Sequence, residues 1–221
     1  MKGTLEQAGP RWRLRFTRDL DHPVPRVWRA VTEPGDLETW FPFRIRGDWA
    51  VGNHLTFSDP QSRVPDFTGE VLAFQPPALL EFRWGPDTLR LEVVARGSGC
   101  TLTLLHTFDE HGKAARDAAG WHVCLDALAR HLDGNSEPPA SLWGEVHPGY
   151  VSSFGPEVLG GRGAGGVRAW VTRPACTASR VSDRGRTWHP GDRAAGQAAH
   201  HAHRARLRAR PAPGRLRPGG Q

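Results

Sequence analysis

The 221-residue sequence has only three cysteines, a single tyrosine and no long apolar run. Cys100, Cys124 and Cys176 have neither metal-ligand nor disulfide spacing, which excludes a disulfide-stapled scaffold. No stretch of about 18 apolar residues is present, so no membrane-spanning helix is predicted. Residues 1–12 also lack the apolar segment of a secretory signal peptide. These absences together predict a cytoplasmic protein without a membrane partner.

Motifs that would identify an enzyme from sequence are missing as well. The chain contains no HExxH, no GxSxG, no phosphate-binding loop and no GxGxxG that follows a strand. The histidines of the first 158 residues show no paired-ligand spacing. We therefore predict no metal and no cofactor, and no sequence pattern indicates catalysis.

Composition divides the chain near Val158. Up to that residue there are 16 Lys and Arg against 21 Asp and Glu, a net charge of −5, whereas the last 63 residues carry 13 against 2, a net charge of +11. Apolar side chains other than alanine number 50 in the first part and 9 in the second. So few large apolar groups cannot offset a backbone ordering entropy of about 1–2 kcal/mol per residue. We predict a folded domain over residues 11–158 and a disordered basic tail over residues 159–221.

The tail contains an Arg- and His-rich run over residues 200–210 with no aromatic residue in it. Arginines held near phosphates would bind nucleic acid with salt-dependent affinity. Arg, Ala, Gly and Pro supply 41 of the last 63 residues, and the codons of all four are GC-rich, so a frameshifted or unselected reading frame would give the same composition. A native disordered extension is the third alternative. We favour the frameshifted or unselected tail and expect no nucleic-acid partner.

Alternation of apolar and polar side chains predicts an antiparallel sheet in the first domain. Trp12, Leu14 and Phe16 alternate with arginines, the pattern of a half-buried strand. Short segments rich in Leu, Val, Phe and Thr follow, separated by turns that contain proline or glycine. The predicted strands are residues 12–20, 54–58, 67–74, 79–84, 88–95 and 101–108. This spacing indicates a meander of five to seven strands.

Three helices are predicted around these strands. Residues 24–33 have apolar positions at helical spacing and Pro25 in the first turn, and a second short helix is expected over residues 34–40. After Lys113, apolar residues recur at helical spacing up to Leu132, and Gly134 suits a left-handed C-terminal cap. The apolar stripe of this long helix must lie on the apolar face of the sheet. The predicted fold class is therefore α+β.

Four segments of the domain resemble a known superfamily. They are VPRVWRAVTEPGDLETWFP (24–42), FTGEVLAFQPPALLEFRWG (67–85), TLTLLHTF (101–108) and AAGWHVCLDAL (118–128). They are similar to the SRPBCC superfamily, in the branch that resembles the C-terminal domain of the heat-shock-protein-90 ATPase activator. The resemblance covers residues 12–155 and implies a helix-grip fold, in which a curved antiparallel sheet wraps around a long C-terminal helix and leaves a cavity. Its members include lipid-transfer proteins, polyketide cyclases, hormone receptors and co-chaperone domains, so the fold does not define the function.

Large aromatic side chains carry the prediction of a binding site. A helix and a concave sheet leave space between them, which either these side chains or a ligand must fill. We expect a small hydrophobic or amphipathic ligand there, bound mainly through apolar burial at about 25 cal/mol per Å2. The alternatives are a chaperone-associated domain with a chaperone as partner, and a polyketide cyclase-like or dehydratase-like enzyme. The predicted ligand-binding residues are Trp28, Trp40, Phe41, Phe67, Phe82, Trp84, His106, Trp121 and Leu125.

His106 is the candidate acid–base residue. It alternates in phase with Leu104 and Phe108, so its side chain is expected to point toward the long helix, where it would act on a bound carbonyl or enol. The simpler interpretation is a hydrogen-bonded core histidine. His122 and Asp126 are separated by one helical turn and could form a polar corner at the mouth of the pocket, but we favour their interpretation as an ordinary surface pair.

Overall fold

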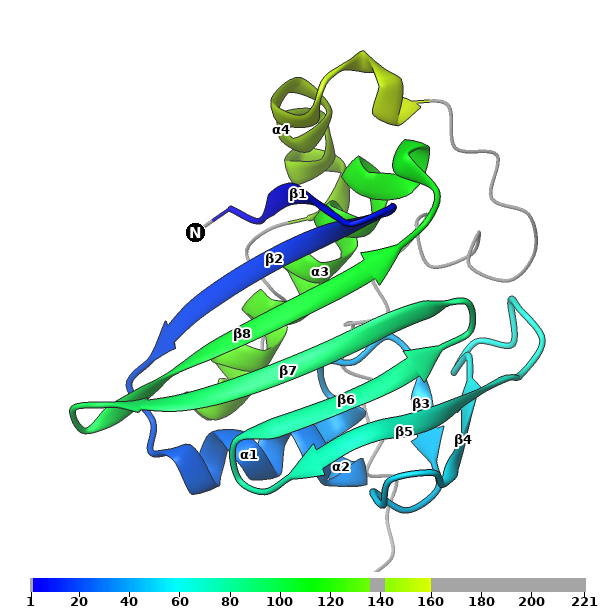
Figure 1. The fold of residues 1–221 in the computed structure, drawn as a ribbon. Helices are drawn as coiled ribbons and strands as arrows, with labels where there is room; N and C mark the ends of the chain where they lie inside the picture. The colour runs from blue at the N-terminus through cyan, green and yellow to red at the C-terminus, as the bar shows by residue number, and fades with distance from the viewer. Residues whose placement is uncertain (1, 136–141, 160–221) are drawn as a thin grey trace, which may run out of the picture. The chain divides into compact units, whose positions relative to one another are not determined.

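The computed structural model describes residues 2–135 and 142–159 (Figure 1). Apart from Leu159, the predicted tail of residues 159–221 lies outside these ranges. Within the two ranges, no helix combines the length and the hydrophobicity needed to cross a membrane.

Eight antiparallel strands form one sheet in the order β1-β2-β8-β7-β6-β5-β4-β3 (Figure 1). The strands are β1 (Thr4–Ala8), β2 (Arg11–Leu20), β3 (Arg44–Arg46), β4 (His54–Ser58), β5 (Phe67–Gln75), β6 (Leu79–Trp84), β7 (Asp87–Arg96) and β8 (Gly99–Phe108). The six predicted strands are all present. The count exceeds the predicted maximum of seven because β1 and β3 have too few apolar residues to show alternation.

The helices are α1 (Val24–Thr32), α2 (Pro34–Leu37), α3 (Ala114–Leu132) and α4 (Trp143–Phe154), with single 3-10 turns η1 (His111–Lys113) and η2 (Pro156–Leu159). The long helix α3 lies against the sheet, with α1 and α2 near its C-terminal end and α4 near its N-terminal end (Figure 1). Gly134 follows α3 with a φ of 73°, as the predicted cap requires. The α+β class is thus confirmed, whereas α4 was not predicted.

Strand β5 changes partners along its length. Its first half pairs with β4 and its second half with β6, with a register shift between Val71 and Ala73. Gly69 lies before this shift, and a Cβ atom there would come within 1.9 Å of the Arg83 carbonyl oxygen. Only glycine permits this close backbone approach, so Gly69 allows the sheet to bend where β5 passes from one neighbour to the other.

Candidate functional site

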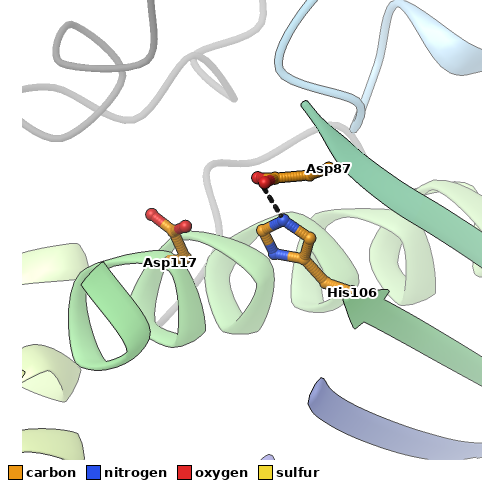
Figure 2. Close-up of side chains that lie close together, drawn as sticks. All are labelled: Asp87, His106 and Asp117. Atoms are coloured by element: carbon orange, nitrogen blue, oxygen red, sulfur yellow. Dashed lines mark hydrogen bonds and ion pairs between the residues drawn. The ribbon is translucent and has the colours of Figure 1, made fainter. Parts of the chain in front are cut away.

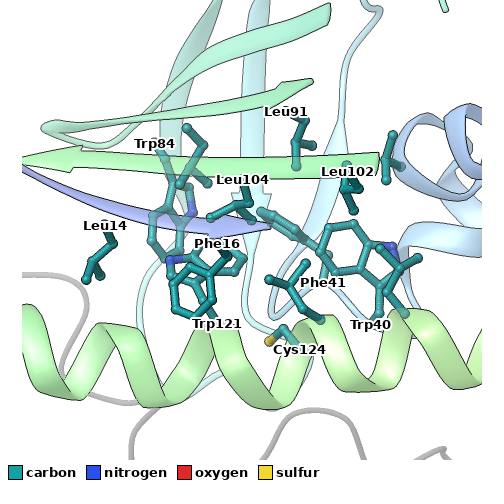
Figure 3. Close-up of a cluster of buried hydrophobic side chains, with 14 of the residues drawn as sticks. Leu14, Phe16, Trp40, Phe41, Trp84, Leu91, Leu102, Leu104, Trp121 and Cys124 are labelled. Atoms are coloured by element: carbon teal, nitrogen blue, oxygen red, sulfur yellow. The ribbon is translucent and has the colours of Figure 1, made fainter. Parts of the chain in front are cut away.

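A layer of aromatic side chains lies between α3 and the sheet (Figure 3). The ring of Trp121, on α3, has its centroid 5.6 Å from that of Trp84 on β6 and 5.7 Å from that of Phe41, which follows α2. None of the three side chains is more than 5% exposed. The element order therefore brings together rings that are up to 80 positions apart in the sequence.

The structure buries seven of the nine predicted binding residues in the core that contains this layer: Trp40, Phe41, Phe82, Trp84, His106, Trp121 and Leu125. The other two are only partly buried. Trp28 stacks on Phe74 with a centroid distance of 5.8 Å, and Phe67 contacts Phe57 at 5.1 Å. That any of these residues contacts a bound molecule remains a prediction.

His106 is the centre of a buried hydrogen-bonded array (Figure 2), and its ring contacts those of Trp84 and Trp121 in the aromatic layer. The indole Nε1 of Trp121 donates to His106 Nδ1 at 3.1 Å, and His106 Nε2 lies 2.8 Å from Asp87 Oδ2. An indole is only a donor, so Nδ1 must be unprotonated and the ring proton lies on Nε2, which donates to Asp87. Because both ring nitrogens are engaged, an acid–base role for His106 would require one of these bonds to break.

Three more charged groups continue the array into α3. Lys113 Nζ contacts Asp87 Oδ2 and lies 3.5 Å from Asp117 Oδ2. Arg116 Nε donates to Asp117 Oδ1 at 2.9 Å. Asp87, Lys113 and Asp117 are all buried. Two carboxylates and two cations thus balance in charge around the neutral tautomer of His106, and we call these five residues the polar centre.

The environment of Asp87 keeps it ionised. Burial by itself raises the pKa of this carboxyl, but the hydrogen bond from His106 and the ammonium group of Lys113 together outweigh burial and hold the pKa below its usual value. Lys113 Nζ also lies 5.1 Å from the ring centroid of Phe108, so a cation–π interaction with this ring further stabilises the ammonium group.

Asp87, His106 and Asp117 each offer a potential metal ligand, with the three atoms within 4.8 Å of one another. Two features argue against a metal at this place. The N–H of Trp121 holds the imidazole proton on Nε2, which removes the lone pair that would face a cation. In addition, the ammonium group of Lys113 contacts both carboxylates. Lys113 therefore supplies the positive charge that a metal would otherwise bring.

Four members of the polar centre, Asp87, Lys113, Arg116 and Asp117, were not predicted from the sequence. Asp87 belongs to a Gly-Pro-Asp turn, and Lys113 precedes the predicted long helix, so both resemble ordinary boundary residues. The spacing of Lys113 and Asp117 by one helical turn was the available signal, because residues at this spacing meet on one helix face.

A second polar network joins α3 to α4 and to the N-terminal segment. His122 lies 3.4 Å from Asp126, as expected, but its side chain is only 14% exposed and its Nδ1 is 2.9 Å from the Tyr150 hydroxyl. That hydroxyl also accepts the N–H of Gly3 at 2.9 Å. Burial raises the pKa of Tyr150, and the Gly3 N–H offsets this only in part. The surface-pair interpretation of His122 was therefore incomplete, because α4 had not been predicted.

The chain is similar to a known protein family and to several solved structures. The family model described as Activator of Hsp90 ATPase homolog 1-like protein matches residues 21–133, from before α1 to the end of α3. No curated protein matches the chain.

Solved structures share the fold. A conserved protein of unknown function from Enterococcus faecalis is 18% identical, with a TM-score of 0.61 over 69% of this chain and 90% of that one. The crystal structure of CalU16 from Micromonospora echinospora is 19% identical, with a TM-score of 0.55 over 71% of this chain and 97% of that one. Identities this low show a common fold and nothing further.

Proposed function

Because the chain belongs to the family of Activator of Hsp90 ATPase homolog 1-like proteins, within the SRPBCC superfamily, we propose that it binds a small apolar or amphipathic molecule between α3 and the sheet. The observation that carries this proposal is the aromatic layer of Phe41, Trp84 and Trp121 next to the buried polar centre. Apolar walls with a few placed polar groups are the usual composition of a small-molecule site.

The energetics of the polar centre support a role beyond stability. Replacing a buried ion network with apolar side chains of similar volume is often neutral or stabilising, because the charges lose their hydration. Asp87 and Asp117 are at most 2% exposed, yet the core around them is otherwise almost wholly apolar. Binding the polar group of a ligand would explain why this network is present, whereas core packing alone does not.

A ligand in this place must separate aromatic rings that now contact one another. Its affinity would be the gain from apolar burial, about 25 cal/mol per Å2, less the cost of moving the indole of Trp121 and of ordering the ligand. Binding should therefore alter the surroundings of Trp121 and Trp84 directly.

Native mass spectrometry of the gently purified full chain tests for a co-purifying molecule. A titration with hydrophobic compounds, followed through the indole N–H signals by NMR, then locates the site. We expect the signals of Trp84 and Trp121 to shift, whereas Trp143, whose indole donates to the Arg116 carbonyl at 3.2 Å, serves as the control. No bound mass together with unchanged Trp84 and Trp121 signals would contradict the proposal.

The family match itself favours a second candidate, a chaperone-associated domain. No described helix covers the outer face of the sheet, which carries threonines and charged residues such as Arg90 and Glu92 and is open to a protein partner (Figure 1). The ATPase rate of a purified Hsp90-type chaperone, with and without the full chain, tests this candidate. Stimulation in the absence of any bound small molecule would favour it over the first.

A further inference from the structure

One carboxylate oxygen of the polar centre lacks a hydrogen bond. Asp117 Oδ2 is buried, and its charge partner, Lys113 Nζ, lies 3.5 Å away in an ion pair without a hydrogen bond between them. A buried acceptor without a donor lowers stability, and more so when the group is charged. This oxygen therefore has the capacity for one further donor.

Asp117 lies on the same side of α3 as the aromatic layer. Asp117 precedes Trp121 by one turn on α3, so both side chains lie on the helix face that meets the sheet (Figures 2 and 3). Asp87 receives its hydrogen bonds from His106 and Lys113 on the single atom Oδ2. Asp117 Oδ2 is therefore the acceptor of the polar centre that has no hydrogen bond, and it lies one helical turn from Trp121.

The balance of charges within the polar centre limits which ligands could bind beside it. Asp87 and Asp117 are balanced by Lys113 and Arg116, and the hydrogen bond from Trp121 holds His106 in its neutral tautomer. A bound carboxylate or ammonium group would leave an uncompensated charge in the core, which is costly. A neutral donor such as a hydroxyl group adds no charge.

We propose that this site takes a neutral aromatic molecule with a hydroxyl group, whose O–H donates to Asp117 Oδ2 while its ring lies against Trp84 and Trp121. The inference rests on the proposed function and adds a ligand class to it. Lys113 Nζ, near the same carboxylate oxygen, is placed to donate to the hydroxyl oxygen in return. Asp117 would thus be the residue that determines specificity.

Four matched probes test this inference on the full chain: naphthalene, 2-methoxynaphthalene, 2-naphthol and 2-naphthoate. They share one ring system and differ in whether they offer no polar group, an acceptor, a neutral donor or a negative charge. We expect 2-naphthol to bind about tenfold tighter than 2-methoxynaphthalene, which corresponds to about 1.4 kcal/mol. The carboxylate of 2-naphthoate should bind most weakly. Isothermal titration calorimetry gives each dissociation constant.

Variants then assign the preference to one residue. Asp117→Asn should reduce the preference for 2-naphthol to about threefold or less, since a hydrogen bond to a neutral group is weaker than one to a carboxylate. Asp126→Asn is the matched control, because Asp126 is on the same helix but contacts His122 and Arg18. It should retain the preference. If Asp117→Asn does not fold, the four probes on the unaltered chain decide.

The outcomes separate the two proposals. Equal binding of 2-naphthol and 2-methoxynaphthalene, or tighter binding of 2-naphthoate, would overturn the hydroxyl inference and leave the proposed apolar site standing. A preference for 2-naphthol that persists in Asp117→Asn would show that Asp117 does not determine specificity. Absence of binding by all four probes would overturn the inference together with the proposed function.

Discussion

At the scale of single residues, Trp121 and Asp87 together determine the tautomer of His106. The indole can only donate, so it selects the imidazole tautomer that donates through Nε2 to Asp87. The ionised carboxylate of Asp87 can only accept, so it favours the same tautomer from the other side of the ring. The candidate acid–base residue is thereby held as a fixed donor toward a carboxylate.

This arrangement predicts the NMR signature of His106. In 15N spectra at neutral pH, we expect Nε2 to be protonated and Nδ1 to be unprotonated. Trp121→Phe, which removes the indole donor, should shift the Nδ1 signal but leave the proton on Nε2, because Asp87 still accepts from it. The exposed His54 provides an internal reference with mixed tautomers. Observation of the proton on Nδ1 of His106 would show that the indole does not control the ring.

Asp87 is the residue whose loss should cost most stability. Asp87→Asn removes one partner of a buried ion pair and leaves the polar centre with one net positive charge, so the free energy of unfolding should fall by about 3–5 kcal/mol. Urea denaturation at pH 7 measures this. Asp109→Asn, which breaks an exposed pair with Arg11, is the control and should cost less than about 1 kcal/mol.

The same carboxyl predicts a pH dependence. Its pKa in the folded protein lies below the ordinary value of 3.8, so its contribution to stability is present above that pH and is lost as the pH falls through the folded value. The unaltered protein should therefore lose stability on acidification below about pH 5 more steeply than Asp87→Asn does. Parallel acid titrations of the two proteins would contradict this assignment.

At the scale of elements, one buried hydroxyl on α4 joins this helix to two other segments of the chain. Tyr150 bonds to Gly3 before β1 and to His122 on α3, so three segments meet at one oxygen atom. Its ring also packs edge-on against Phe16 of β2, with a centroid distance of 6.3 Å. Helix α4 thus extends the apolar layer over the β1–β2 end of the sheet.

Tyr150→Phe tests this attachment. The ring is kept while the Gly3 N–H and His122 lose their partner, so we expect a loss of about 1–3 kcal/mol in the free energy of unfolding and faster hydrogen exchange at Gly3. Ser153→Ala, in the same helix, removes a hydroxyl that donates only to the Gly149 carbonyl and should change stability by less than about 0.5 kcal/mol. Equal effects of the two substitutions would argue against a special role for the Tyr150 hydroxyl.

At the scale of the whole molecule, the domain boundary remains a prediction from composition. The buried core of the described residues extends from Leu14 to Val158. We predict that removal of residues 160–221 changes the Tm of the domain by no more than a few degrees, because residues 159–221 contain only 9 large apolar side chains. Differential scanning calorimetry of both lengths measures the change. A fall of more than about 10 °C would place part of the stabilising core beyond residue 159.

Elements with a clear local pattern were predicted well. Residues 54–58 and 79–84 form strands with the predicted bounds, and α3 begins one residue after Lys113, because alternation and helical spacing are properties of neighbouring residues. Strands β1 and β3 were not predicted, because they have too few apolar side chains to show alternation. Helix α4 contains Pro148, which disfavours helix in local terms, yet it forms where Tyr150 and Trp143 pack against α3.

The amino-acid sequence by itself determined the class of fold and the supply of aromatic side chains, since both depend on composition and on spacing over a few residues. The meeting of Asp87, His106, Lys113 and Asp117 beside the aromatic layer depends instead on how distant segments pack together. These residues come from the start of β7, from β8, from the end of η1 and from the first turn of α3, and only Lys113 and Asp117 are related by local spacing. Chain folding alone brings such separate positions within hydrogen-bonding distance and determines which proton each group holds.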